Sequence, residues 1–195
     1  MILALFDFDG TITKKDTFIS FLQFTHGKFI FYLYFIVLSP ILILYKLKKI
    51  ENWRAKEIVL KFFYMNYTKE KLLSLGEAFE PIIDNMVYEQ AKEKLLWHKS
   101  QNHQVLIVSA SCDIWISAWC KNNNIQLIST TLEFDNNIFK GKLGSKNCFG
   151  QEKVIQIKHH LNLDNFTFIY AYGDSDGDTE MLRLANEPHY KIFNY

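Results

Sequence analysis

The sequence predicts an α/β protein, with a Rossmann-like parallel sheet as its core and a small α-helical cap inserted after the first strand. Two observations carry this prediction. Short, continuous apolar runs alternate with stretches of helical pattern along the chain, as they do in proteins built from a parallel sheet and covering helices. A long helical stretch, residues 17–80, separates the first apolar run from the others, and no simple connecting loop needs that length.

The predicted strands are short runs of apolar residues that end at polar ones. A continuous apolar run indicates a strand buried on both faces, as in a parallel sheet. Three runs have this character and a fourth is weaker: Met1–Phe6, Val105–Val108, Phe166–Tyr172 and, as the weaker one, Ile125–Ser129. The helices expected between them lie over Asp84–Gln101, Cys112–Asn123 and Gln151–Leu161.

Two segments depart from this alternation. In Thr131–Leu143, the turn-forming Asp135-Asn136-Asn137 lies between two β-like pieces, which indicates a hairpin. Thr17–Glu80 has a helical pattern and would cover the crevice at the edge of the sheet. We therefore expect a core made of residues 1–13 and 89–195, and a cap made of residues 14–88.

Composition and charge exclude several classes of protein. With 49% hydrophobic and 16% aromatic residues, the chain is expected to be globular. The net charge is +1 and no stripe of basic residues is present, so we expect no nucleic-acid partner. Three cysteines without CxxC spacing predict neither a disulfide framework nor a zinc site. The first apolar run is short and follows no basic region, so we expect a cytoplasmic protein without a signal peptide.

Two carboxylates follow the first predicted strand, in the segment Asp7-Phe8-Asp9-Gly10-Thr11. Residues two apart at the end of a strand can face the same cavity. Crowded carboxylates raise one another's pKa unless a cation lies between them. Mg²⁺ suits such a site because it takes oxygen ligands and accepts a phosphate among them. One carboxylate could then attack phosphorus while the other moves the proton of the leaving group.

Further polar groups stand at the ends of other predicted elements. Ser109 ends the second strand, where its hydroxyl and the neighbouring backbone N–H groups suit a phosphate oxygen. Lys153 opens a helix and could neutralise carboxylates and a phosphate, and Gly173–Asp178 (GDSDGD) follows another strand. The acidic loop is not an EF-hand, because Thr179 and Ala185 stand where that motif needs Gly and Glu. Because ligands of parallel sheets bind at the carboxyl ends of the strands, we expect these groups to converge.

Taken in this order, DFDGT, the strand-end Ser109, Lys153 and GDSDGD resemble the four motifs of the haloacid dehalogenase superfamily. The resemblance covers the predicted core. The placement of the cap, between the first and second motifs, resembles the phosphoserine-phosphatase-like branch. The first and fourth motifs are specific, whereas Ser109 and Lys153 gain their weight from position.

This resemblance implies a role for each matching residue. Asp7 would form an aspartyl-phosphate and bind Mg²⁺, while Asp9 would act as general acid/base and offer its backbone carbonyl to the metal. The phosphoryl group would be held by Thr11, Ser109, the backbone of Ala110 and Lys153. The acidic loop would bind the metal through Asp174 and, directly or through water, Asp178. Because dehalogenases of the superfamily lack the second aspartate, Asp9 favours phosphoryl transfer over dehalogenation.

Two cap residues bear on the substrate. Phosphoserine phosphatases carry a Glu for the substrate amine at the position of Asp16, which here could either meet a cation or only cap a helix. They also use a cap arginine for the substrate carboxylate. The single cap arginine, Arg54 in NWRAKE, does not match that family's arginine pair. Phosphoserine phosphatase activity therefore remains an alternative.

An apolar stretch without charges, Phe29–Tyr45, is flanked by lysines at positions 28, 46, 48 and 49. It is close to the roughly 20 residues that a transmembrane helix needs. A single crossing would place Asp7 and Ser109 on opposite sides of a membrane, so we exclude it. Two alternatives stay open: a buried cap core, with a homodimer contact, or a peripheral patch or acyl pocket facing anionic headgroups.

The sequence thus predicts a Mg²⁺-dependent phosphomonoester hydrolase that acts on a small, amphipathic or lipid phosphate. Some bacterial relatives with similarly apolar caps act on lipid phosphates. A phosphotransferase or mutase that uses the same aspartyl-phosphate is the nearest rival. A rival of another class is a non-catalytic, membrane-associated binding protein with this fold.

Overall fold

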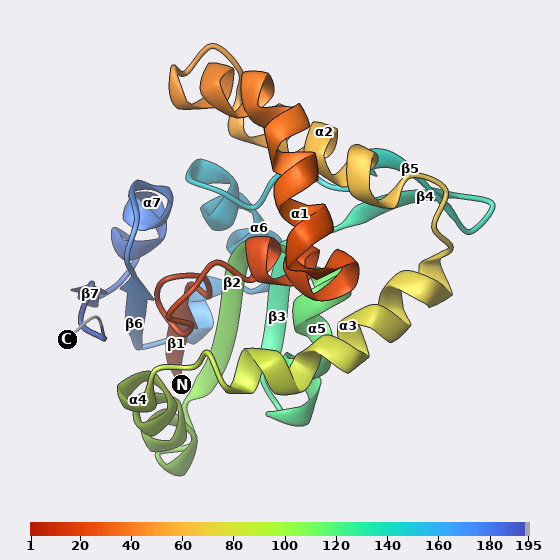
Figure 1. Ribbon diagram of the computed structural model, residues 1–195. Helices are drawn as coiled ribbons and strands as arrows, with labels where there is room; N and C mark the ends of the chain where they lie inside the picture. The colour runs from red at the N-terminus through yellow and green to blue at the C-terminus, as the bar shows by residue number, and fades with distance from the viewer. Residues whose placement is uncertain (194–195) are drawn as a thin grey trace.

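The computed structural model describes residues 1–193 and contains a five-stranded, fully parallel sheet (Figure 1). Its strand order is β3-β2-β1-β6-β7. The strands are β1 (Ile2–Phe6), β2 (Gln104–Cys112), β3 (Gln126–Thr130), β6 (Phe168–Gly173) and β7 (Glu187–Tyr190). The predicted α/β class with a Rossmann-like parallel core is confirmed.

The central strand β1 is buried on both faces, which explains its unbroken apolar run. Ala4 and Phe6 join one hydrophobic cluster, whereas Leu3 and Leu5 join the cluster on the opposite face. All four side chains are fully buried. Such a strand ends where the sequence turns polar, so Asp7 emerges at the carboxyl edge of the sheet.

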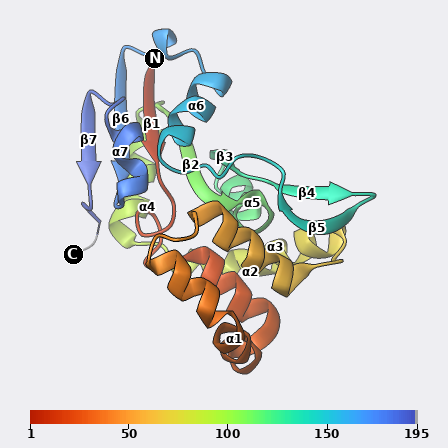
Figure 2. The same cartoon turned by 90° about the horizontal axis from the view of Figure 1, so that it is seen from above.

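Helices cover both faces of this sheet (Figure 2). On one face, α4 (Glu89–Ser100) and α5 (Asp113–Asn122) contribute buried residues to the same cluster as Phe6. On the other face, α6 (Gln151–His160) and the short α7 (Thr179–Leu182) pack on the cluster that contains Leu3. Two short 3₁₀ turns, Leu163–Asn165 and Asp176–Asp178, flank β6. This two-sided covering is the layer arrangement expected of a parallel sheet.

The cap consists of three helices: α1 (Thr17–Lys46), α2 (Asn52–Tyr64) and α3 (Lys69–Asp84). The predicted hairpin is present as β4 (Leu132–Asp135) and β5 (Ile138–Leu143), and it packs against α2. The chain leaves the core and returns to it at adjacent points, because Thr13 forms a β-bridge with Val87. The boundaries of a separate cap domain, residues 14–88, stay a prediction.

The predicted helix over Asp84–Gln101 is wrong in its extent. The structure has a break there, with α3 ending at Asp84 and α4 beginning at Glu89. In the break, the chain hydrogen-bonds to the segment after β1: Lys14 donates to the carbonyl of Met86, and Tyr88 donates to that of Ile12. These tertiary bonds use backbone groups that a continuous helix would need for itself.

The long helix α1 is bent at Gly27, whose φ of 75° and ψ of 154° are not helical. Residues 17–26 pack into the molecule, and Phe21 and Leu22 are fully buried there. Beyond the bend, residues 28–46 form a segment that we call distal α1. Phe31 and Leu38 are buried in it, whereas most of its other side chains are at least partly exposed. Within one chain this segment is thus only partly buried, and a homodimer contact and a peripheral membrane patch both stay predictions.

Candidate active site

A cavity of 320 Å³ lies at the carboxyl edge of the sheet, between the core and the cap helices α1 and α2. The core contributes charged and hydroxyl groups to its wall, from the ends of β1 and β2, the start of α6 and the loop after β6. These residues are Asp7, Asp9, Ser109, Ser111, Lys153, Ser175 and Asp178, and Ala110 lies among them. The cap contributes mainly apolar side chains, among them Phe18, Ile19, Phe35, Leu42 and Val59.

Lys153 links two of the carboxylates at the floor of this cavity. Its Nζ donates to Oδ1 of Asp7 over 2.5 Å and to Oδ1 of Asp178 over 2.7 Å. A third bond runs to the carbonyl of Val108 at the end of β2. All three donors of the ammonium are thus used, and the side chain is fully buried. Lys153 therefore fixes the relative position of residues from β1, β2 and the loop after β6.

Burial and charge shift the pKa values in this group in different directions. Burial raises the pKa of Asp7 to about 7, although the nearby Lys153 ammonium opposes the shift. Burial also acts to lower the pKa of Lys153, but the charges of Asp7 and Asp178 outweigh it and hold that pKa above its usual value. For Asp178, burial is outweighed by Lys153 and by hydrogen bonds, and the pKa is lowered. Asp178 and Lys153 thus form a stable ion pair, and Asp7 is the carboxylate that an added cation would affect most.

The loop after β6 holds Asp178 and Asp174 in fixed orientations. Oδ2 of Asp178 accepts bonds from the backbone N–H groups of Asp174 and Ser175 and from the Ser175 hydroxyl, at 2.9–3.1 Å. Oδ1 of Asp174 accepts a bond from the Thr11 hydroxyl over 3.0 Å. Gly10, with φ of +85°, allows this contact because a Cβ there would lie 2.4 Å from Oδ2 of Asp174.

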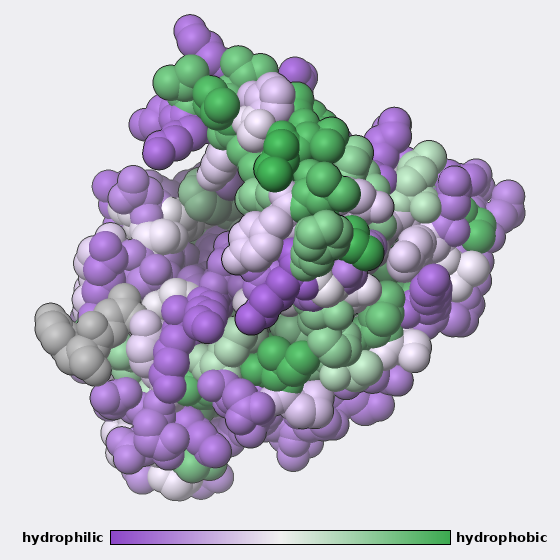
Figure 3. Space-filling view, in the orientation of Figure 1, coloured by the Kyte–Doolittle hydropathy of each residue, from purple (hydrophilic) through white to green (hydrophobic). Residues whose placement is uncertain are grey.

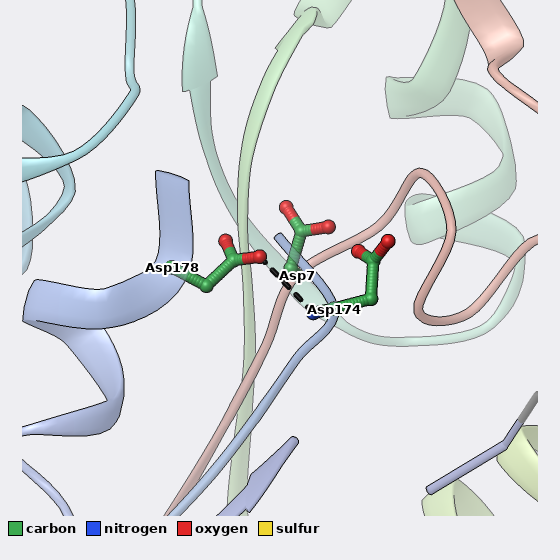
Figure 4. Close-up of side chains that lie close together, drawn as sticks. All are labelled: Asp7, Asp174 and Asp178. Carbon is green, nitrogen blue, oxygen red and sulfur yellow. Dashed lines mark hydrogen bonds between the residues drawn. The ribbon is translucent and has the colours of Figure 1, made fainter. Parts of the chain in front are cut away.

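Asp7, Asp174 and Asp178 could together hold a metal ion, since each offers an oxygen within 4.8 Å of the others. Figure 4 shows the three carboxylates gathered around one point from two segments of the chain. The donor set is all oxygen, which fits Mg²⁺ rather than a softer metal. Among the described residues, Oδ2 of Asp7 and Oδ2 of Asp174 accept no hydrogen bond from the protein. The residues present therefore fit a magnesium site.

Asp9 lies apart from this group and is held by the cap. Its Oδ1 accepts the backbone N–H of Thr17 over 2.6 Å, and its Oδ2 accepts the hydroxyl of Ser111 over 2.5 Å. Burial raises its pKa to about 6, with a further contribution from the charge of Asp16. A carboxyl group with a pKa near neutrality, lining the same cavity as a second carboxylate, is suited to moving a proton.

The family model for haloacid dehalogenase-like hydrolases matches residues 4–183, which include every group described above. The chain belongs to this family.

Individual proteins are similar to this chain in sequence or in structure. Protein CicA of Caulobacter vibrioides is 31% identical over 98% of this chain and 86% of its own length. A protein of unknown function from Bordetella pertussis has a similar structure, with a TM-score of 0.83, 22% identity, and coverage of 96% of this chain and 88% of that one. A phosphoserine phosphatase, solved as an analogue of its phospho-aspartyl intermediate, gives a TM-score of 0.69 at 16% identity, with coverage of 98% and 88%.

The residues that the haloacid dehalogenase-like motifs single out fall into two groups in the structure. The first group lines the cavity and consists of Asp7, Asp9, Ser109, Ala110, Lys153 and Asp178. Thr11 and Asp174 instead lie at a smaller crevice beside it and reach the site through their mutual hydrogen bond. Asp176 is exposed, as expected for a solvated loop residue.

Of the two cap residues selected from the sequence, one lines the cavity and the other lies outside it. Asp16 lines the cavity and is also the N-cap of α1, since its Oδ1 accepts the N–H of Ile19 over 2.9 Å. Arg54 is exposed and lies outside the cavity wall, where its guanidinium stacks over Trp53 and approaches Glu51. The sequence-based choice of Arg54 therefore has no contact with the site in this structure.

The cap cation that does reach the site is Lys56, which sequence reasoning missed. Its Nζ donates to the carbonyl of Ala110 and to Oδ1 of Asn147, both over 2.7 Å. Burial lowers its pKa. Neither contact is with a carboxylate, so among residues 1–193 the ammonium, which lines the cavity, has no direct counter-ion. Only a weak signal in the sequence pointed to Lys56. It stands two residues after Arg54, and residues two apart lie on different sides of a helix, so if Arg54 faces solvent, Lys56 can face the site.

Ser111 was also missed, although it stands only two residues after Ser109. Its hydroxyl binds Asp9, and its backbone N–H donates to the hydroxyl of Ser109 over 3.0 Å. The strand β2 shifts register against β3 between Ser109 and Cys112. Ser109 and Ser111 are two residues apart, so both hydroxyls lie on the same side of the strand and face the same cavity.

Proposed function

We propose that this chain is a Mg²⁺-dependent phosphatase that cleaves phosphomonoesters through an aspartyl-phosphate on Asp7. One observation supports this most directly: Asp7 and Asp9 line a single cavity but have different partners. Asp7 is paired with a buried ammonium, whereas Asp9 is held by a backbone N–H and a hydroxyl and has a pKa of about 6. Two carboxylates in unlike surroundings can take unlike roles, one as nucleophile and one as acid.

In the first half-reaction, a carboxylate oxygen of Asp7 attacks phosphorus and the bond from phosphorus to the leaving oxygen breaks. The proton of Asp9 passes to that leaving oxygen. Oδ2 is the Asp7 oxygen suited to the attack, since Lys153 occupies Oδ1. Lys153 and the hydroxyl of Ser109 would stabilise the charge on the transferring group.

In the second half-reaction, Asp9 is a carboxylate and takes a proton from water. The water oxygen attacks phosphorus, the bond between phosphorus and Asp7 breaks, and inorganic phosphate leaves. Mg²⁺ held by Asp7, Asp174 and Asp178 would neutralise negative charge at the phosphoryl group. The same cation would favour the ionised form of Asp7, whose pKa burial otherwise raises.

The apolar cap side of the cavity wall suits an amphipathic phosphomonoester, and phosphoserine is the alternative substrate. The cap side of the wall is mainly apolar, and Lys56 is the cation that the cap contributes to it. The two charges of a zwitterionic amino acid could meet Asp16 and Lys56, while an alkyl group would gain from contact with Phe35, Leu42 and Val59. Each methylene buried there would raise kcat/KM about fourfold, which corresponds to roughly 0.8 kcal/mol.

The test is hydrolysis of p-nitrophenyl phosphate by the purified chain with MgCl₂ and with EDTA. The Asp7→Asn variant should lose activity by about a thousandfold or more, and Asp9→Asn by a hundredfold or more. Incubation with magnesium and fluoroberyllate should trap an aspartyl-phosphate mimic in the unmodified chain and not in Asp7→Asn. Full activity of Asp7→Asn with an unchanged circular dichroism spectrum would refute the mechanism. Comparing short and long alkyl phosphates with phosphoserine then ranks the substrate classes.

A further inference from the structure

Distal α1, residues 28–46, presents an apolar face that nothing in the described chain covers. Phe29 is 83% exposed, Ile36 is 70% exposed and Ile43 is 56% exposed. These residues are spaced by seven, which places them along one side of a helix. Tyr32, Leu33 and Val37 widen the same exposed region. Figure 3 shows hydrophobic residues gathered over the part of the molecule that Figure 1 assigns to α1.

The opposite side of this helix belongs to the cap and the cavity. Phe31 packs beside Phe63 of α2, with ring centroids 6.4 Å apart, and is only 3% exposed. Phe35 and Leu42 line the cavity. A helix that is apolar on all sides is normally covered on all sides. The outer face therefore calls for a partner of its own.

By length and composition, α1 could cross a membrane, since its mean hydropathy over one window is 2.0 and only 11% of that window is buried. Its neighbours exclude a crossing. Thr17 at its start is bound to Asp9, and Lys56, soon after its end, is bound to Ala110. Both ends thus return to the same cavity. In addition, α2 packs along distal α1 through Tyr34 and Phe62, whose rings are 4.9 Å apart. The helix can only lie along a surface.

The charged residues that flank this face most closely in the sequence are all basic. Lys28 precedes it, and Lys46, Lys48 and Lys49 follow it, all exposed. Between Asp16 and Glu51 the sequence has no acidic residue. A second copy of the chain, packed face to face, would bring these lysines near lysines. An anionic lipid surface would instead bind about fivefold more tightly for each basic residue that lies near it.

We propose that distal α1 docks this protein on an anionic phospholipid bilayer, with Phe29, Ile36 and Ile43 inserted among the acyl chains. The flanking lysines then lie at the level of the headgroups, as in other interfacial helices. Docking would place the cavity about 10 Å from the lipid, which is the diameter of one helix. The proposal does not depend on the phosphatase mechanism.

The experiment is flotation of the full chain with vesicles of phosphatidylcholine, with and without phosphatidylglycerol. Binding is expected with phosphatidylglycerol and should weaken as salt is raised. The double variant Phe29→Ser/Ile36→Ser should partition about 100-fold less. Lys46→Glu/Lys48→Glu/Lys49→Glu should lose a similar amount. The matched control is Leu96→Ser/Ile155→Ser, which removes two exposed apolar side chains from the core helices α4 and α6 and should bind normally.

Each remaining outcome decides against the proposal. No flotation of the unmodified chain would overturn it, as would equal binding by Phe29→Ser/Ile36→Ser. Equal binding to phosphatidylcholine alone would overturn the role given to the lysines. A dimer in analytical ultracentrifugation that Phe29→Ser/Ile36→Ser dissociates, without vesicle binding, would assign the face to a second copy. Hydrolysis of p-nitrophenyl phosphate should be unchanged in all of these variants, so a failure of docking is distinct from a failure of the proposed chemistry.

Discussion

The backbone N–H of Thr17 donates a hydrogen bond to Oδ1 of Asp9 over 2.6 Å. Thr17 is the first residue of α1, so the N-terminus of the cap helix directly holds a carboxylate of the site. The position of Asp9 is thereby coupled to the position of the cap. A free N–H at the first turn of a helix is well placed for this, because it has no partner within the helix.

Replacing Thr17 by proline should remove this donor while keeping the helix, since proline is well tolerated at the first helical position. Thr17 also binds Ser111 and Trp115 through its hydroxyl, so Thr17→Val is the matched control that keeps the N–H. We expect kcat for p-nitrophenyl phosphate to fall about tenfold more in Thr17→Pro than in Thr17→Val. This factor corresponds to the loss of one hydrogen bond to a charged group. Equal kcat in the two variants would show that the N–H does not matter.

Lys56 and Arg54 form a second matched pair. Lys56→Met removes the bonds to Ala110 and Asn147 and the charge that faces the cavity, so kcat/KM should fall about tenfold or more. Arg54→Met changes an exposed side chain outside the cavity wall and should leave steady-state kinetics as they are. A loss of activity in Arg54→Met alone would mean that the cap moves to bring Arg54 into the site.

Gly10 and Gly27 both have positive φ, but only one of them is crowded. A Cβ on Gly10 would lie 2.4 Å from Oδ2 of Asp174, whereas a Cβ on Gly27 would meet nothing within 4 Å. Both alanine variants should lose about 1–2 kcal/mol of unfolding free energy from backbone strain. Only Gly10→Ala should raise the Mg²⁺ concentration needed for half-maximal activity, because it displaces Asp174. Denaturant unfolding and magnesium titration measure the two effects separately.

His98 should make the fold sensitive to acid. It is fully buried between His103 and Tyr172, at 2.8 and 2.9 Å. Burial, with the nearby charges of His103, Lys94 and His189, lowers its pKa from 6.5 to about 3. Between these values the unfolded chain binds a proton that the folded chain does not, so stability falls as the pH drops below about 6.5. The slope of Tm against pH should be smaller in His98→Gln, and unchanged in His159→Gln, which alters an exposed residue of α6.

The sequence-based predictions succeeded where the signal is local. The run Ile2–Phe6 is buried on both faces, and the change to Asp7 marks its end, so both the strand and the carboxylate could be located from adjacent residues. The edge strand β7, Glu187–Tyr190, was not predicted, because EPHY contains a proline and a charge and pairs only through contact with β6. Strand propensity at such an edge depends on tertiary context.

The missed site residues share one physical reason. Lys56 meets Ala110 and Asn147, which are 54 and 91 residues away in sequence, and no periodicity within α2 reveals such partners. Ser111 meets Asp9, which is 102 residues away. Alternation puts Ser111 on the same side of β2 as Ser109 but does not reveal that partner. Arg54 was preferred because arginine is the usual ligand for carboxylate and phosphate, but its side of α2 faces solvent. Residue type could be recognised from the sequence, whereas orientation required the assembled cap.

The central position of β1 has a consequence for synthesis on the ribosome. Its neighbours in the sheet, β2 and β6, follow it only after the whole cap, and Thr11 and Asp174, which bind each other, are 163 residues apart. At about 5–20 residues per second, translation leaves on the order of ten to thirty seconds between them. For about the first hundred residues of that interval the strand that carries Asp7 has neither neighbour, and it then has only β2 until β6 is complete, while the apolar helix α1 has already been made. The apolar helix α1 is therefore made long before the last strand that fixes Asp7 in the centre of the sheet.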